Sequence, residues 1–101
     1  MKPYYTDYVN HIIKTYVNHT YDELTSQVDR TNWKAADCVV TGLPQAEQDV
    51  VRAIYSRLSY RAFRPVPVLV NEYCEQTGRE FELVMNVIRK VSKRVKKERG
   101  L

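Results

Sequence analysis

Cysteine is scarce in this chain of 101 residues, which contains only Cys38 and Cys74, far apart in sequence. They form no CxxC pair, and no histidine stands at metal-ligand spacing from either one. This spacing excludes the usual zinc and redox motifs, and we expect both to be small buried residues with free thiols. His11 and His19 have no partner nearby in sequence and are expected at the surface. No metal and no cofactor are predicted.

Long apolar runs are also missing. No stretch approaches the roughly 20 apolar residues of a membrane span, and the opening MKPYYTDYVN holds no apolar core of a secretory signal. We therefore expect a soluble, intracellular protein with no membrane partner. There is no glycine-rich phosphate loop, nucleophile elbow or metal motif, so the sequence predicts that the protein is not an enzyme.

Strand-like alternation is confined to the run VPVLV, whose flanking prolines argue against a strand. Elsewhere apolar residues recur at three- and four-residue intervals, which is typical of helices. With 44% hydrophobic residues, the chain is predicted to form one all-α domain over residues 1–101, with about five helices and the last one longest. The expected helices cover residues 6–19, 32–41, 44–55, 67–77 and 80 to the C-terminus. A loop or short helical turn separates the first two, and Gly42 is expected to end the second in a left-handed conformation.

Positive charge is concentrated toward the C-terminus. From Arg79 to Leu101 there are eight basic and three acidic residues, a balance of +5, whereas the preceding residues carry −1. This asymmetry favours an anionic partner, most often nucleic acid, and the alternative is a solvated charged helix end. A second basic stretch contains Arg57, Arg61 and Arg64, with no acidic residue between Asp49 and Glu72. We expect phosphate contacts there as well.

Three spaced residues in YCEQTGREFELV predict a helix-turn-helix. Two helices that cross steeply need a small residue at the crossing, and Cys74 is small. The turn needs a positive backbone dihedral, which Gly78 reaches without steric cost. The second helix then needs an apolar residue packed against the first, and Val84 is placed to supply it.

The last expected helix has one apolar side and one polar side. At about 100° per residue, Glu82, Asn86, Arg89, Lys93 and Lys97 fall opposite the apolar residues. In a complex with double-stranded DNA, base edges would be faced by Glu82, Met85, Asn86 and Arg89, with Asn86 and Arg89 as the best readers of adenine and guanine. Phosphates would be held by Lys93, Lys96, Lys97 and the Arg57 to Arg64 loop. Lys90 completes the expected DNA-binding set.

A resemblance to known families also indicates a DNA-binding protein. The stretch LPQAEQDVVRAIY, the helix-turn-helix and VIRKVSKRVKKERGL together resemble region 4 of bacterial sigma factors over residues 43–101, leaving residues 1–42 as N-terminal helices. Together with YYTDYVNHI, NWKAAD and KERGL, they look like small phage-encoded transcriptional regulators of the RinA and ArpU type. That resemblance implies activation of phage late genes by DNA binding beside a promoter, in the cytoplasm of a bacterial host.

Two other functions fit the same sequence. A helical adaptor would bind RNA polymerase or a phage assembly component, and a DNA-packaging recognition subunit would bind DNA without activating transcription. The adaptor would be favoured by an exposed aromatic patch on the first helix, whose apolar side includes Tyr5, Tyr8 and Tyr16. We expect these tyrosines instead to pack in the core, with their hydroxyls hydrogen-bonded at its edge. A homodimer would fit palindromic DNA, whereas a sigma-like module can act as a monomer.

Overall fold

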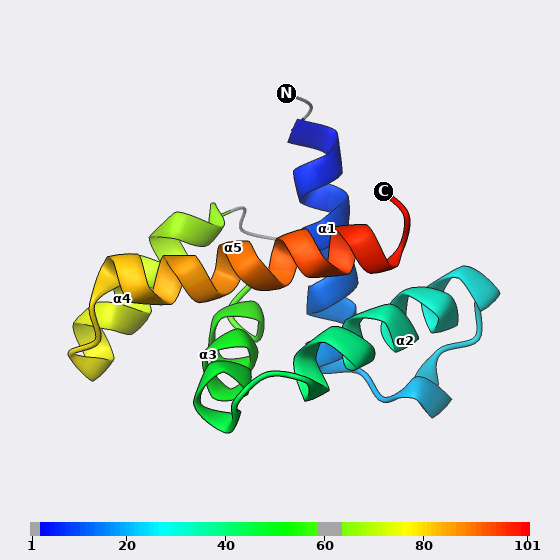
Figure 1. Cartoon of the computed structure of the whole chain (residues 1–101), viewed down its shortest axis with the longest axis horizontal. Coiled ribbons are helices and arrows are strands. Elements are labelled where there is room, and N and C mark those ends of the chain that lie inside the picture. Colours follow the sequence, from blue (N-terminus) through cyan, green and yellow to red (C-terminus); the bar gives the residue numbers. More distant parts are fainter. Residues whose placement is uncertain (1–2, 59–63) are drawn as a thin grey trace.

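The computed structural model describes residues 3–58 and 64–101, with side chains from residue 8 onward, and in this part it contains five α-helices and no strand (Figure 1). The elements are α1 (Pro3–Asn18), a 3-10 turn η1 (Tyr21–Glu23), α2 (Gln27–Thr41), α3 (Gln45–Tyr55), α4 (Val66–Thr77) and α5 (Phe81–Glu98). The prediction of an all-α fold is confirmed, and α5, with 18 residues, is the longest helix described. None of these helices is both long and apolar enough to cross a membrane.

The second helix differs most from expectation. It begins at Gln27, five residues before the predicted Asn32. Ser26 is its N-cap, with the side-chain oxygen accepting a hydrogen bond of 3.3 Å from the Asp29 amide. The helix ends at Thr41 as predicted, but Gly42 has φ −81° and ψ −5°, so the expected left-handed conformation there is wrong. The carbonyl of Val40 instead accepts from the Leu43 amide in a tight turn.

One apolar core joins all five helices. In Figure 1, α5 runs lengthwise across the molecule, with α4 near its start and α2 near its end. It packs against each of the other four helices. The largest fully buried side chains come from every helix: Ile12 and Ile13, Val40, Ile54 and Tyr55, Leu69 and Val70, Val91 and Val95. One face of α5 is therefore committed to the fold, and only the remaining face is available to a partner.

Tyr16 of α1 packs in the core with a bonded hydroxyl as expected, and Tyr55 of α3 does the same, whereas the side chain of Tyr5 lies outside the described residues. Tyr16 is buried, and its hydroxyl donates to the Asp37 carboxylate at 2.7 Å. Burial, reinforced by this hydrogen bond, raises the pKa of Tyr16 to about 12. Tyr55 is fully buried and donates to the Asn10 side chain at 2.8 Å, and burial raises the pKa of its hydroxyl too.

The C-terminal end of α5 is fixed by a polar chain across three elements. The Arg99 guanidinium donates to the side-chain oxygen of Asn32 in α2. The Asn32 amide donates in turn to the Tyr8 hydroxyl of α1 at 3.1 Å. Asn32 is almost fully buried, and both ends of its amide are satisfied, as a buried polar group requires. This chain sets the direction in which the last turns of α5 point.

Candidate nucleic-acid interface

Gly78 has the backbone conformation, and Cys74 and Val84 the burial, expected of them at the turn between α4 and α5. Gly78 adopts φ +74°, and its amide donates to the Cys74 carbonyl at 2.8 Å. Cys74 and Val84 are both buried in the core on either side of the turn. A side chain at Gly78 would meet no atom within 4 Å, so the backbone dihedral alone restricts this position.

The two cysteines differ in their surroundings. Cys74 is buried as expected, and burial raises the pKa of its thiol. Cys38 is exposed, so the expectation of two buried cysteines is wrong for this residue. It lies one turn before the end of α2 and lines a hollow together with Arg94, Lys97 and Glu98 of α5.

The exposed side of α5 carries the predicted polar residues. Four apolar side chains, Val84, Ile88, Val91 and Val95, are buried on the opposite side. Opposite them lie six exposed polar residues: Glu82, Asn86, Arg89, Lys93, Lys96 and Lys97. The helical periodicity read from the sequence is therefore confirmed for this face, and we call these six residues the α5 strip.

Met85 does not belong to the α5 strip, and its assignment as a base-facing residue is wrong. Its side chain is 8% exposed and forms part of the core. Three residues before Ile88, it lies only about 60° around the helix from that buried position. Because α5 packs against four other helices, this margin of the apolar side is covered as well.

Lys90 connects helices rather than extending the α5 strip. Its ammonium group lies 2.5 Å from a carboxylate oxygen of Glu47, and both side chains are about one-third exposed. Glu47 belongs to the first turn of α3, where a carboxylate also complements the positive helix end. This ion pair ties the middle of α5 to α3 and partly neutralises Lys90.

At its start, the α5 strip contains a small internal network. The Arg89 guanidinium lies 3.5 Å from a carboxylate oxygen of Glu82 and 3.2 Å from the side-chain oxygen of Asn86. All three side chains are exposed. An exposed ion pair of this kind contributes less than about 1 kcal/mol, so Arg89 can exchange Glu82 for another acceptor at low cost.

Toward its C-terminus α5 carries cations that are not neutralised. Lys93, Arg94 and Lys97 are exposed, and none forms an ion pair with another residue in the described part of the chain. Arg94 was missed by the sequence reasoning, because its position on the helix lies beside the apolar side. It is exposed because α2 ends at Thr41 and leaves a hollow next to it. The density of basic residues in RKVSKRVKKER was the available signal.

That hollow lies between the C-terminal ends of α2 and α5 and has a volume of about 510 Å³. Its lining consists of Cys38, Val39, Gly42, Arg94, Lys97 and Glu98. We refer to it as the α2–α5 hollow. Two cations and one carboxylate give its lining a net positive charge.

The arginines before α4 are engaged within the fold. Arg57 is half-buried, donates to the Gln76 side chain at 2.7 Å and stacks over the Tyr73 ring. Arg64 forms an ion pair with Glu72. Both contacts tie the connecting segment to α4, so a phosphate would have to compete with Gln76 for Arg57 and with Glu72 for Arg64. Arg61 lies outside the described residues.

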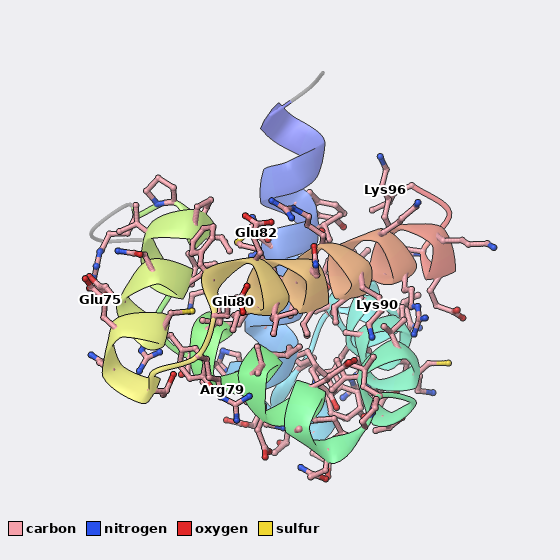
Figure 2. All side chains as sticks on the ribbon, turned by 60° about the vertical axis from the view of Figure 1, so that its left-hand side comes forward. Glu75, Arg79, Glu80, Glu82, Lys90 and Lys96 are labelled. Carbon is pink, nitrogen blue, oxygen red and sulfur yellow. The ribbon has the colours of Figure 1, made fainter. Side chains whose placement is uncertain are left out.

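Acidic residues gather at the opposite end of α5 from most of its basic residues. Glu75 of α4 and Glu80 and Glu82 around the first turn of α5 lie near the turn that joins the two helices, whereas Lys90 and Lys96 lie farther along (Figure 2). Arg79 accompanies these carboxylates and is exposed. Charge therefore changes sign along the helix, from acidic at its start to basic at its end.

Comparisons with known proteins add no relative. No family model matches the chain, and neither the curated proteins nor the solved structures give a match. In the described residues, no group of three or more histidine, cysteine or acidic side chains is placed to hold a metal ion. The exposed surface of α5 is therefore the main indication of function.

Proposed function

We propose that this protein is a double-stranded DNA-binding transcriptional regulator, of the kind represented by the small phage-encoded RinA and ArpU regulators, and that it activates late genes from a site beside a promoter. The observation that supports this proposal is the row of exposed cations on α5. Lys93, Arg94 and Lys97 project from a helix whose other side is held in the core. An anionic polymer is the partner that such a row attracts.

The cations lie on an anchored helix and not on a mobile charged tail, and this anchoring favours binding to DNA. The Lys90–Glu47 ion pair and the Arg99–Asn32 hydrogen bond hold the middle and the end of the helix. The cations are thus presented on a fixed scaffold, which reduces the conformational entropy lost when they contact phosphates. Each phosphate contact releases condensed counterions, and this release supplies the affinity.

Sequence preference would come from the start of the α5 strip. Asn86 can contact adenine and Arg89 can contact guanine through paired hydrogen bonds in the major groove. Arg89 already lies beside Asn86, so the two side chains can address neighbouring bases. Binding to guanine requires Arg89 to leave Glu82, which is an inexpensive exchange between exposed groups.

The test is the salt dependence of binding by the intact chain to a fluorescent duplex. Three to four phosphate contacts predict that affinity falls roughly 40- to 150-fold between 50 and 200 mM salt. The double variant Lys93→Gln/Lys97→Gln should reduce the slope of log affinity against log salt by about 2. Arg52→Gln, which removes an exposed cation from α3, is the control and should leave the slope unchanged. A parent chain that does not bind at 50 mM salt, or a double variant that binds like the parent, contradicts the proposal.

A protein adaptor is the second candidate, and one apolar hollow favours it. Ala46 and Val50 of α3 and Leu83 and Val87 of α5 contribute to the lining of a space of about 230 Å³, and Leu83 is 62% exposed. The described aromatic residues of α1 do not add to it, because Tyr16 is buried and Tyr8 is half-buried. Purified bacterial RNA polymerase is the probe. An adaptor requires binding that Leu83→Ser abolishes and that Lys93→Gln/Lys97→Gln leaves intact.

A further inference from the structure

The charge gradient along α5 bears on which end of the helix meets DNA. In helix-turn-helix proteins the recognition helix enters the major groove with its N-terminal residues at the base edges. Here that end carries Glu80 and Glu82, and Glu75 of α4 lies at the same end of the molecule (Figure 2). Carboxylates beside phosphates repel them, so the usual orientation would bring three carboxylates and one cation, Arg79, toward the DNA, a net negative charge.

The opposite end offers the complementary surface. Arg94 and Lys97 line the α2–α5 hollow, and both are exposed without an ion pair in the described part of the chain. Lys93 lies one turn before Lys97 on the same helix. Glu98 is the only carboxylate in the described lining of the hollow, against the two cations Arg94 and Lys97. A phosphate in the hollow would therefore meet net positive charge on the α5 side.

The dimensions of the helix fit this orientation. Arg89 and Lys97 are eight residues apart, which corresponds to a rise of about 12 Å in an α-helix. The major groove of B-DNA is also about 12 Å wide. With Arg89 at the base edges, Lys97 can therefore lie at the sugar-phosphate backbone that borders the groove, and Arg94, about 140° around the helix from Arg89, lies in the lining of the α2–α5 hollow beside it. The first turn of α5, which precedes Asn86 and carries Glu82, then lies farthest from the DNA.

We propose that α5 docks on duplex DNA through its C-terminal half and that the α2–α5 hollow binds a phosphate of the DNA backbone. This inference rests on the proposed DNA-binding function and specifies the surface that carries it. Arg94 is a positioning contact in the complex, and the hollow supplies affinity without reading sequence.

Two matched arginines test the orientation. Arg94 and Arg79 are both exposed and lie near opposite ends of α5, and neither forms an ion pair with a described residue. Arg94→Gln should lower the salt slope by about 0.9 and weaken binding about eightfold at 0.1 M salt, the loss expected for one phosphate contact. Arg79→Gln should bind within twofold of the parent.

The outcomes separate this inference from the proposed function. If the parent chain binds DNA and Arg79→Gln is the weaker of the two variants, α5 docks by its N-terminal end and the inference is wrong. If the parent binds and neither variant differs from it, the hollow is not a phosphate site. If the parent does not bind duplex DNA at all, the proposed function fails and the inference falls with it.

Protection of the Cys38 thiol from alkylation by bound DNA gives an independent test. Cys38 is exposed in the lining of the hollow, whereas Cys74 is buried. A saturating duplex should slow alkylation of Cys38 by N-ethylmaleimide at least several-fold, as measured by mass spectrometry. The thiol introduced by Arg79→Cys marks the other end of α5 and should react at the same rate with and without DNA. Protection of that thiol together with an unchanged rate at Cys38 would overturn the proposed orientation.

Discussion

Replacing Gly78 with alanine tests the turn between α4 and α5 without disturbing its packing. A Cβ at this position meets no atom within 4 Å, so no steric clash contributes to the effect. What remains is the backbone, held at φ +74°, where an L-residue is disfavoured by roughly 1–2 kcal/mol. Alanine also restricts the unfolded chain, which offsets part of this cost. We expect a net loss of about 1 kcal/mol in the free energy of unfolding.

Thermal unfolding followed by circular dichroism measures this loss. For a domain of this size, 1 kcal/mol lowers Tm by roughly 4–8 °C. Gly78→Val should lower it further, because a β-branched residue resists positive φ more strongly, and Gly78→Asn should lower it less. These three variants have the same site and differ only in their tolerance of the left-handed region.

Gly42 supplies the matched control, because its φ of −81° suits any residue. A Cβ there would lie 3.5 Å from the carbonyl oxygens of Cys38 and Val39, which is ordinary contact. Gly42→Ala should therefore be neutral or stabilise the protein by up to about 1 kcal/mol. If Gly78→Ala unfolds at the parent temperature, or if both alanine variants lose stability equally, the argument from backbone conformation is refuted.

Three further expectations concern single side chains. Arg89→Ala should cost about 1–3 kcal/mol of binding to a preferred site and far less to a scrambled duplex; equal losses on both would remove it as a base reader. A double-mutant cycle of Lys90→Met and Glu47→Gln, measured by urea unfolding, should give a coupling free energy of about 1 kcal/mol between the two side chains. A coupling of zero would show that the pair does not stabilise the α3–α5 contact. The raised pKa of Tyr16, about 12, favours the neutral hydroxyl in the folded state. The stability it contributes is present below pH 10 and is lost as pH rises toward 12, by up to about 1.4 kcal/mol per pH unit; Tyr16→Phe should flatten this decline, and an unchanged decline would contradict it.

Local signals in the sequence were sufficient to predict the positions of most helices. Prolines mark the starts of α3 and α4, Gly78 marks the end of α4, and the apolar spacing of α5 separates its buried from its exposed side at every position but Met85 and Arg94. The start of α2 was missed because its first turns are polar on nearly every side. The pair Ser26 and Asp29, which forms the N-cap hydrogen bond, was the signal available there.

The residues at the candidate interface that were assigned incorrectly depend on how the helices pack, which the local sequence does not show. Periodicity places Met85 and Arg94 near the two margins of the same apolar side, yet one is buried and the other exposed. The difference depends on which neighbouring helix continues past each margin, and α2 ends beside Arg94. Likewise, nothing near Arg57 or Arg64 in sequence indicates that Gln76 and Glu72 of α4 will engage them. Such pairs form only when the helices are packed.

The position of α5 among the other helices has a consequence for synthesis of the protein. Because α5 packs against α1, α2, α3 and α4, the core lacks its central member until α5 has left the ribosome. The hydrogen-bond partner of Arg99 is Asn32, 67 residues earlier. A nascent chain can therefore form its N-terminal helices, but it cannot complete their packing or make this hydrogen bond before α5 is synthesised. The cationic surface and the completed core consequently arise in the same step, and a chain that stops short of α5 has neither.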